Sequence, residues 1–256
     1  MKPRLIDVHT HAQFSEFDID RDAVIRRALD AGIWMINVGT QRDTSANSCE
    51  LAHRYEGVFT TVGLHPTEIH EKFDYDFYKK LATDSKVVAI GECGLDYFRP
   101  APETKEKQKE VFTKHIQLAR EVKKPLMIHC REAFADLIDI LTANRSALNN
   151  IPGVCHFFSG TIEDAQKLID LGFSFSFGGV ITFAREYEKL IKFIPLGRIL
   201  LETDAPYVAP QVYRGKRNEP LYVEEVAPKI AKILDKDFDE IAQKTTENAT
   251  KIFGLS

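Results

Sequence analysis

Leu5-Ile6-Asp7-Val8-His9-Thr10-His11 is an apolar run near the start of the chain, and it ends in two histidines one residue apart. Side chains on a β-strand alternate between its two faces, so residues two apart point the same way. We therefore expect His9 and His11 to converge on one metal ion from the end of a single strand. A lone His-x-His pattern is weak support for a metal site, so later strands must supply the remaining ligands.

Seven more runs, mostly rich in Val, Ile, Leu and Phe, follow the first one and predict further β-strands. The eight predicted strands are Arg4–His11, Trp34–Thr40, Val58–His65, Val87–Leu95, Leu126–Arg131, Val154–Phe158, Phe173–Gly178 and Ile199–Asp204. Segments with helical spacing of apolar residues lie between them. The clearest predicted helices are Ala23–Ala31, Glu106–Val122, a segment from the capping box at Thr161–Asp164 to Gly172, Leu221–Leu234 and Phe238–Phe253.

The alternation of strands and helices indicates parallel strands with helical crossovers. Eight repeats in 256 residues predict one α/β domain over residues 1–256, a (β/α)8 TIM-type barrel with extra C-terminal helices. A doubly wound nucleotide-binding sheet fits less well, because no G-x-G-x-x-G follows the first strand and no Walker loop is present. The longest irregular stretch, Ala205–Pro220, follows the eighth strand, and such long loops are usually functional or disordered.

Composition limits the location and the partners. The formal net charge is −4, so any contact with a polyanion must be local. No segment approaches the roughly 18 apolar residues of a membrane span, and the N-terminus lacks a signal-peptide core. The four cysteines, Cys49, Cys93, Cys130 and Cys155, form no C-x-x-C pair. We expect a cytoplasmic protein whose cysteines pack as small core residues.

Polar side chains stand at the C-terminal ends of six of the predicted strands. They are His9, His11, His65, Glu92, His129, His156, Glu202 and Asp204. In a barrel these strand ends share one rim, where active sites of the fold are built. Any single histidine could be an ordinary hydrogen-bonded residue. Buried imidazoles and carboxylates crowded on one rim, however, are hard to satisfy without a cation.

Two divalent cations fit the number of predicted ligands better than one, and Zn, Mn, Co or Mg would suit mixed nitrogen and carboxylate ligands. The predicted ligands are His9, His11 and Asp204 for one ion, His129 and His156 for the other, and Glu92 as a bridge. Paired cations roughly 3.5–4 Å apart suit hydrolysis, especially displacement at phosphorus, by lowering the pKa of a water and neutralising developing charge. Asp204 could in addition take the proton of the attacking water.

Two residues of the rim keep two interpretations each. Glu202 is either a catalytic-site carboxylate that orients a ligand or the water, or a buried carboxylate paired with Arg or Lys. His65 either contacts the substrate phosphate or the leaving oxygen, or caps the loop that begins at Pro66 by a hydrogen bond. We favour the functional interpretation for His65.

Basic and aromatic residues on the same rim are candidate substrate contacts. The basic residues are Arg99, Arg131, Arg214, Lys216 and Arg217. They could follow a phosphodiester backbone, or they could form ordinary solvated loops. The aromatic residues Tyr97, Phe98, Tyr207 and Tyr213 could stack on bases, and we expect at least half of them to pack the loops instead.

Seven motifs stand in order along the chain: Asp7-Val8-His9-Thr10-His11, Gly63-Leu64-His65-Pro66, Gly91-Glu92-Cys93-Gly94-Leu95-Asp96-Tyr97, His129-Cys130-Arg131-Glu132-Ala133, His156-Phe157-Phe158-Ser159-Gly160, Glu202-Thr203-Asp204-Ala205-Pro206 and 214–220. Together they resemble the TatD family of metal-dependent deoxyribonucleases, within the amidohydrolase-like barrels. The resemblance covers nearly the whole chain. It implies a TIM-type barrel, divalent cations and hydrolysis of DNA, often from the 3′ end. It also implies the metal ligands His9, His11, Glu92, His129, His156 and Asp204.

Two positions depart from the family pattern. Phe157 replaces the Cys that often follows the histidine of the sixth strand, and Cys93 replaces an aliphatic residue. Both are expected to face away from the metals, so neither should affect the chemistry.

The function that this resemblance implies is a metal-dependent 3′-5′ exonuclease on single-stranded DNA. One alternative is an amidohydrolase-like enzyme that acts on a carbon-centred amide, ester or lactone. Such barrels often carry a metal-bridging lysine on strand four, where this chain has Glu92. Another alternative is a metal-binding module without catalysis, against which the complete ligand set argues. DNA is the expected partner, and neither a membrane nor an obligate protein partner is indicated.

Overall fold

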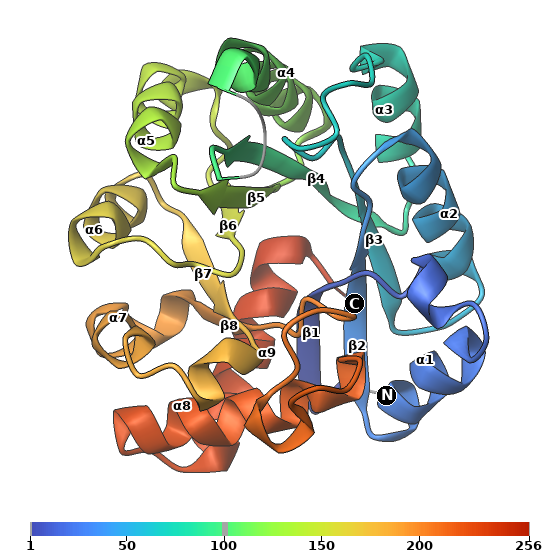
Figure 1. Cartoon of the computed structure of the whole chain (residues 1–256), viewed down its shortest axis with the longest axis vertical. Helices are drawn as coiled ribbons and strands as arrows, with labels where there is room; N and C mark the ends of the chain where they lie inside the picture. Colours follow the sequence, from blue (N-terminus) through green and yellow to red (C-terminus); the bar gives the residue numbers. More distant parts are fainter. Residues whose placement is uncertain (1, 99–101, 256) are drawn as a thin grey trace.

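The computed structural model of the chain describes residues 2–98 and 102–255. Its strands all pair in parallel and close into a barrel in chain order, from β1 round to β8 and back to β1 (Figure 1). The strands are β1 Leu5–Thr10, β2 Ile33–Val38, β3 Val58–Val62, β4 Val87–Asp96, β5 Leu126–Arg131, β6 Gly153–Cys155, β7 Ser174–Phe177 and β8 Ile199–Leu201. The predicted (β/α)8 fold is confirmed.

Helices surround the barrel (Figure 1). They are α1 Arg21–Asp30, α2 Arg42–His53, α3 Tyr75–Ala82, α4 Lys105–Val122, α5 Phe134–Ala143, α6 Ile162–Asp170, α7 Tyr187–Phe193, α8 Val226–Leu234 and α9 Phe238–Phe253. The predicted capping box opens α6, because Thr161 and Asp164 each bind the backbone N–H of the other. The helix predicted from Leu221 starts as the 3-10 segment Pro220–Glu225 and becomes α-helical only at Val226.

Apolar side chains fill the barrel at the end away from the polar rim. Val8, Ile36, Met127 and Leu200 share one buried cluster with Phe253 and other residues at the C-terminal end of the chain. In Figure 1, α9 lies behind β1 and β8, so this helix covers that end of the barrel. A second, larger cluster packs the outer faces of the strands against the helices. The packed bottom leaves the opposite rim as the place for a site.

Several strands end earlier than predicted, and the difference concerns the rim. His11, His65, His156, Glu202 and Asp204 all lie just beyond the last residue of their strand. At Asp204 the backbone φ is 54°, which is incompatible with a continued strand. The turns therefore aim these side chains across the mouth of the barrel.

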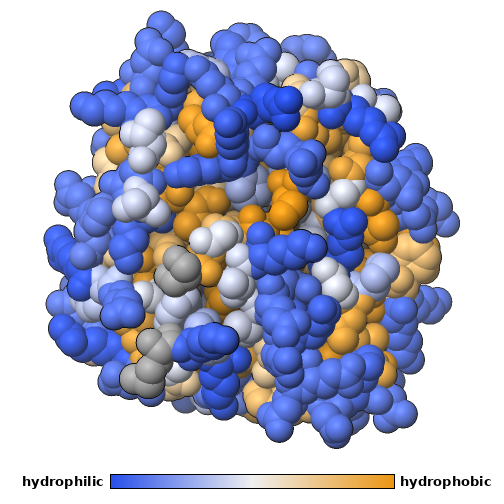
Figure 2. Space-filling model, turned by 180° about the vertical axis from the view of Figure 1, so that it is seen from behind, coloured by the Kyte–Doolittle hydropathy of each residue, from blue (hydrophilic) through white to orange (hydrophobic). Residues whose placement is uncertain are grey.

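The four cysteines are buried and unpaired, as predicted for small core residues. Burial raises the pKa of each thiol, which makes them poor nucleophiles. No helix in the described residues has the length and apolar character needed to cross a bilayer. Hydrophilic residues cover most of the face seen from behind, with smaller apolar patches between them (Figure 2).

Candidate metal centre

The polar rim encloses a cavity of about 850 Å³ at the C-terminal end of the barrel. Six of the eight predicted rim residues line it: His11, His65, Glu92, His129, His156 and Asp204. The other two, His9 and Glu202, are fully buried beside it. The structure thus brings together side chains from six strand ends, which the sequence places up to 195 residues apart (204 − 9).

One set of side chains gathers around the Oε2 atom of Glu92. The Nε2 atoms of His9 and His11 lie 3.4 and 3.8 Å from this oxygen and 3.2 Å from each other. The Oδ1 atom of Asp204 lies 3.3 Å from His11 Nε2 and 3.7 Å from His9 Nε2. The convergence of His9 and His11 is as predicted. Regular alternation is not its whole cause, because the register of β1 on β2 shifts between Asp7 and Thr10.

A second set gathers around the other oxygen of Glu92, Oε1. His156 Nε2, His129 Nδ1 and His65 Nε2 lie 2.8, 3.1 and 3.2 Å from it. His129 Nδ1 and His156 Nε2 are 3.3 Å apart. The carboxylate of Glu92 therefore stands between two separate groups of nitrogen atoms.

The donor atoms fit divalent cations. Ligand atoms about 2.1 Å from a tetrahedral cation lie roughly 3.4 Å apart, and the atoms of the first set lie 3.2–3.8 Å apart. Ligand atoms of His9, His11 and Glu92 all lie within 4.8 Å of one another. Two imidazole nitrogens that face each other at 3.2 Å need a proton or a cation between them. The residues present are thus suited to hold metal ions.

Two histidines each have a far nitrogen, the ring nitrogen that points away from Glu92, and the hydrogen bonds of these far nitrogens also favour cation binding. His11 Nδ1 lies 2.8 Å from the carbonyl oxygen of Val38, and His129 Nε2 lies 3.0 Å from a carboxylate oxygen of Asp96. Each far nitrogen therefore donates its hydrogen, and the nitrogen that faces Glu92 keeps its lone pair. Sequence reasoning missed Asp96. The available signal was its spacing, four residues after Glu92 on the same strand and so on the same face.

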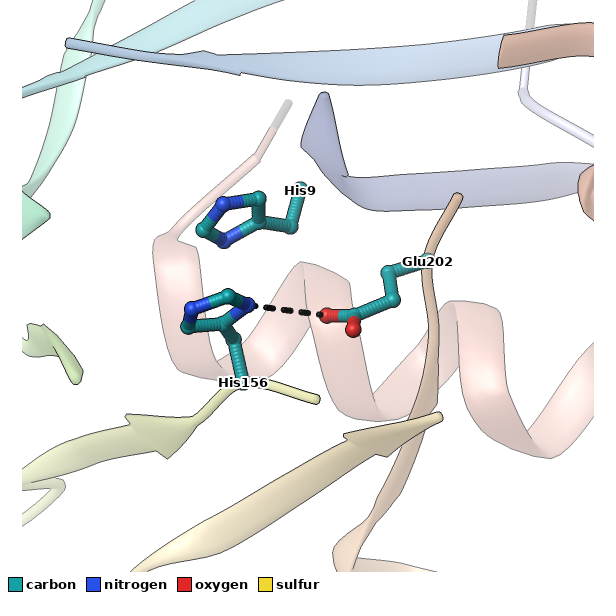
Figure 3. Close-up of side chains that lie close together, drawn as sticks. All are labelled: His9, His156 and Glu202. Carbon is teal, nitrogen blue, oxygen red and sulfur yellow. Dashed lines mark ion pairs between the residues drawn. The ribbon is translucent and has the colours of Figure 1, made fainter. Parts of the chain in front are cut away.

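Glu202 lies beside His156 of the second set (Figure 3). Its Oε2 atom is 3.8 Å from His156 Nδ1 and accepts a 2.5 Å hydrogen bond from the hydroxyl of Ser176. His9 stacks on His156 with ring centroids 3.7 Å apart. Within the described residues no Arg or Lys pairs with Glu202. The predicted role of Glu202 in orienting a ligand or the water stays a prediction.

Buried charge dominates the electrostatics of the centre. Burial alone would raise the pKa of Glu92, but the surrounding histidines hold it well below its usual value. Burial likewise opposes protonation of His156, yet Glu92 and Glu202 raise the pKa of this histidine well above its usual range. Burial lowers the pKa of His9. The carboxylates thus draw positive charge into the site, whether it comes from protons or from cations.

Hydrogen bonds from buried side chains hold the turn that carries Asp204, on both sides of that residue. Asp7 accepts hydrogen bonds from the backbone and hydroxyl of Thr203 at 2.9 and 2.6 Å. The buried side chain of Asn218 donates to the carbonyl oxygens of Thr203 and Tyr207 at 2.8 and 2.7 Å. The sequence did not predict these hydrogen bonds. Asp7 is distant in sequence from Thr203, and Asn218 lies in a loop whose basic residues suggested substrate contacts instead.

The structure separates the predicted basic residues. Arg131 and Arg214 line the cavity, where their guanidinium groups stack on Phe98 and Phe183. Arg217 instead forms two bonds of 2.9 and 2.6 Å to Asp20, and it is absent from the described cavity lining. Lys216 is exposed on the same loop, also outside that lining. The remaining residue, Arg99, lies outside the described residues.

The predicted aromatic residues divide in a similar way. Tyr97 donates to Asp136 at 2.6 Å, and Tyr213 stacks on Tyr222 with ring centroids 3.7 Å apart, so these two pack their loops. Phe98 and Tyr207 are about half exposed at 53% and 47%, and Tyr207 lines the cavity. The expectation for Phe157 was wrong. With a φ of 45°, it departs from strand geometry and lines the cavity.

Comparison with known proteins now gives the family. The model of the family described as "TatD related DNase" matches residues 6–254. The chain belongs to the TatD family. It is 39% identical to the uncharacterized metal-dependent hydrolase YabD of Bacillus subtilis, over 98% of this chain and 100% of that protein. It is 35% identical to the 3′-5′ ssDNA/RNA exonuclease TatD of Cronobacter sakazakii, with 97% of each covered.

Solved structures agree with the family assignment. The crystal structure of YjjV, a TatD homologue from Escherichia coli, superposes with a TM-score of 0.92 at 30% identity, with all of both chains covered. The chain is thus a metal-dependent hydrolase of the TatD family, of the nuclease type that cleaves ester bonds.

Proposed function

We propose that this TatD-family chain is a 3′-5′ exonuclease that hydrolyses phosphodiester bonds of single-stranded DNA with two divalent cations. The observation that carries the proposal is the position of Glu92, whose two oxygens each face a separate group of nitrogen ligands. One carboxylate placed between two groups suits a bridge between two cations. The names of relatives such as the Cronobacter exonuclease support the substrate and the polarity.

The proposed ligands follow the two sets of atoms. His9, His11 and Asp204 would hold one cation with Glu92 Oε2, and His129 and His156 would hold the other with Glu92 Oε1. Bound there, divalent cations lower the pKa of a water and neutralise charge that develops on phosphoryl oxygens.

The carboxylates of the chain have proposed roles beyond ligation. Asp204 is partly exposed to the cavity, and its pKa is lowered because the His11 hydrogen bond and nearby histidine charges outweigh the effect of burial. It therefore stays ionised, and its position beside the cavity, rather than its lowered pKa, suits it to accept a proton from a water there. Glu202 accepts from Ser176 and faces His156, so it would orient that ring.

Substrate contacts are assigned to the wall of the cavity. Arg131 and Arg214 face it with charge that suits a phosphate backbone, and exposed Lys216 extends the same loop. We keep Arg99 as a proposed substrate contact. The ion pair of Arg217 with Asp20 is better suited to stabilising the loop. Tyr207 and Phe98 offer rings for base stacking. We place the enzyme in the cytoplasm, in keeping with its four unpaired cysteines.

The test is degradation of single-stranded DNA labelled at either end, with Mg²⁺, Mn²⁺, Co²⁺ or Zn²⁺ added to chelated and dialysed protein. We expect stepwise shortening from the 3′ end that requires a cation and is lost in Glu92→Ala and Asp204→Ala. Circular dichroism of both variants verifies that the barrel still folds. Lactone, ester or amide turnover without nuclease activity would favour the carbon-centred alternative, and full activity after chelation would exclude metal catalysis.

A further inference from the structure

His65 stands in the loop after β3, and its ring lines the cavity beside Glu92 and His129. Ligand atoms of these three residues lie within 4.8 Å of one another, which is close enough for a shared cation. His65 could therefore be a metal ligand or a hydrogen-bond donor. The position of the ring hydrogen decides between these roles, because a ligand nitrogen needs a free lone pair.

Thr67 binds the nitrogen of His65 that points away from Glu92. The backbone N–H of Thr67 donates to His65 Nδ1 at 3.2 Å, and the Thr67 hydroxyl lies 2.7 Å from the same atom. The Thr67 hydroxyl also lies 3.3 Å from Glu68 Oε1 and can either donate or accept, so it does not fix the tautomer. The backbone amide can only donate, so its bond uses the lone pair of Nδ1. The hydrogen of the ring is then on Nε2, which lies 3.2 Å from Glu92 Oε1.

His11 and His129 have the opposite arrangement. Their far nitrogens face a carbonyl oxygen and a carboxylate oxygen at 2.8 and 3.0 Å, and both of these partners accept. Each ring therefore carries its hydrogen on the far side and a lone pair toward Glu92. The hydrogen-bond partner of the nitrogen that points away from Glu92 thus differs among these histidines. Where it is an acceptor, as at His11 and His129, the ring can bind a cation; where it is a donor, as at His65, the ring can only donate toward Glu92.

We propose that His65 donates its Nε2 hydrogen to a phosphoryl oxygen of the substrate, that Thr67 holds the ring in this state, and that His65 binds neither cation. This inference rests on the proposed function, since the oxygen belongs to the scissile phosphate. A donor fixed beside the reacting phosphorus stabilises negative charge that develops there. Thr67 acts only through the ring of His65 and is a positioning residue.

The state of the ring can be measured without any substrate. In Zn²⁺-loaded protein with ¹⁵N-labelled histidine, two-bond ¹H–¹⁵N spectra report which nitrogen carries hydrogen, and His65→Gln assigns the signals. We expect hydrogen on Nε2 of His65 and a lone pair on the nitrogens of His11 and His129 that face Glu92. Thr67→Val should shift the His65 Nδ1 signal without moving those of the other rim histidines. Hydrogen on His65 Nδ1 would overturn the proposal.

Cation binding and turnover then separate donor from ligand. Calorimetric titration with Zn²⁺ should give the same stoichiometry and affinity for His65→Ala as for the unchanged chain. His129→Gln should bind one of the two ions about 10-fold less tightly or worse. Cleavage of DNA should fall about 10²–10³-fold in His65→Ala and partly recover in His65→Gln, which keeps an N–H donor. His70→Ala changes an exposed histidine of the same loop and serves as control.

The outcomes distinguish this inference from the function on which it rests. Equal loss of Zn²⁺ affinity in His65→Ala and His129→Gln would make His65 a ligand and overturn the proposal, as would undiminished cleavage by His65→Ala. A chain that cleaves no phosphodiester would contradict the proposed function. The spectra and the Zn²⁺ titration would in that case still support or overturn the assignment of His65 as a donor.

Discussion

At the scale of single residues, the second nitrogen of each rim histidine matters as much as the nitrogen that faces Glu92. Val38 and Asp96 accept from the rings of His11 and His129, and this contact fixes which nitrogen can bind a cation. Val38 and Asp96 act on a cation through the histidine rings and are not among its proposed ligands. Their substitution should therefore change cation affinity before it changes the fold.

Asp96→Asn tests this view at one ligand. An amide can still contact His129, but it removes the charge that stabilises the ring hydrogen on Nε2. We expect affinity for one of the two cations to fall about 10- to 100-fold, with the other nearly unchanged. Calorimetric titration with Zn²⁺ measures both steps. Asp136→Asn, at a carboxylate outside the cavity lining described for this chain, is the matched control, and equal weakening of both steps would contradict the assignment.

His115 is a buried histidine outside the metal centre, and it predicts a pH dependence of stability. Its Nε2 accepts from the backbone of Leu64 at 3.0 Å and its Nδ1 donates to Val111 at 2.8 Å, so the ring must be neutral. Burial lowers its pKa to about 4. The unfolded chain, with the ordinary value near 6.5, binds this proton first, so stability is present above pH ~6.5 and declines as pH falls toward ~4.

The expected loss from this one residue is about 2 kcal/mol by pH 5. Urea unfolding of chelated protein at a series of pH values measures it, because chelation removes the competing effect of cation release. His115→Gln cannot take up this proton and should show a flatter profile over the same range. Identical pH profiles for the two chains would refute the assignment.

At the scale of elements, the close approach of neighbouring strands determines where the ligand side chains lie along the barrel. Gly94 of β4 pairs with His129 of β5 and has a φ of 133°. A Cβ atom at Gly94 would lie 2.0 Å from the carbonyl oxygen of His129. Only glycine permits this contact, so Gly94 helps to place His129 against Glu92.

Gly94→Ala should therefore destabilise the chain by about 2 kcal/mol or more, from strain and overlap with the backbone of β5. It should also weaken cation binding, because β5 must move and carries His129 with it. Thermal unfolding and Zn²⁺ titration measure the two effects. Gly197→Ala is the control, since a Cβ there meets no atom within 4 Å. Equal melting temperatures for the two variants would contradict this account of Gly94.

The sequence was informative about the elements because apolar runs and helical spacing are local. Burial on both faces marks the barrel strands, and polar residues that end such runs mark the rim. A hydrogen bond from His65 to the loop that begins at Pro66 was one of its two predicted interpretations, and Thr67 makes that bond. The contacts of Asn218 were not predicted, because a hydrogen-bond partner depends on how loops fold over one another. Arg217 shows the same limit, since its partner Asp20 lies 197 residues away. A basic residue in a loop does not by itself reveal whether it meets substrate or another loop.

At the scale of the whole molecule, the metal centre joins segments from both ends of the chain. His9 and Asp204 stand beside each other, and Asp204 also donates its backbone N–H to the carbonyl oxygen of His9 at 2.8 Å. Cations bound there would tie β1 to the loop after β8 and reinforce the closure that the pairing of β1 with β8 already provides. Binding to the folded state alone raises stability by mass action.

Removal of cations should consequently lower the stability of the entire barrel. At cation concentrations about 100 times the dissociation constant, the expected contribution is about 2.7 kcal/mol for each site. Calorimetric melting with and without chelator measures the difference. Glu92→Gln should melt at nearly the same temperature in both conditions. An unchanged chain that is indifferent to chelation would contradict a resident metal centre.

Anomalous scattering from crystals grown with Mn²⁺ tests most directly whether Glu92 lies between two cations, as we propose. We predict two peaks. One should lie among His9, His11, Asp204 and Glu92 Oε2, and the other among His129, His156 and Glu92 Oε1. A single peak remote from Glu92, or no peak in the cavity at saturating Mn²⁺, would contradict the account.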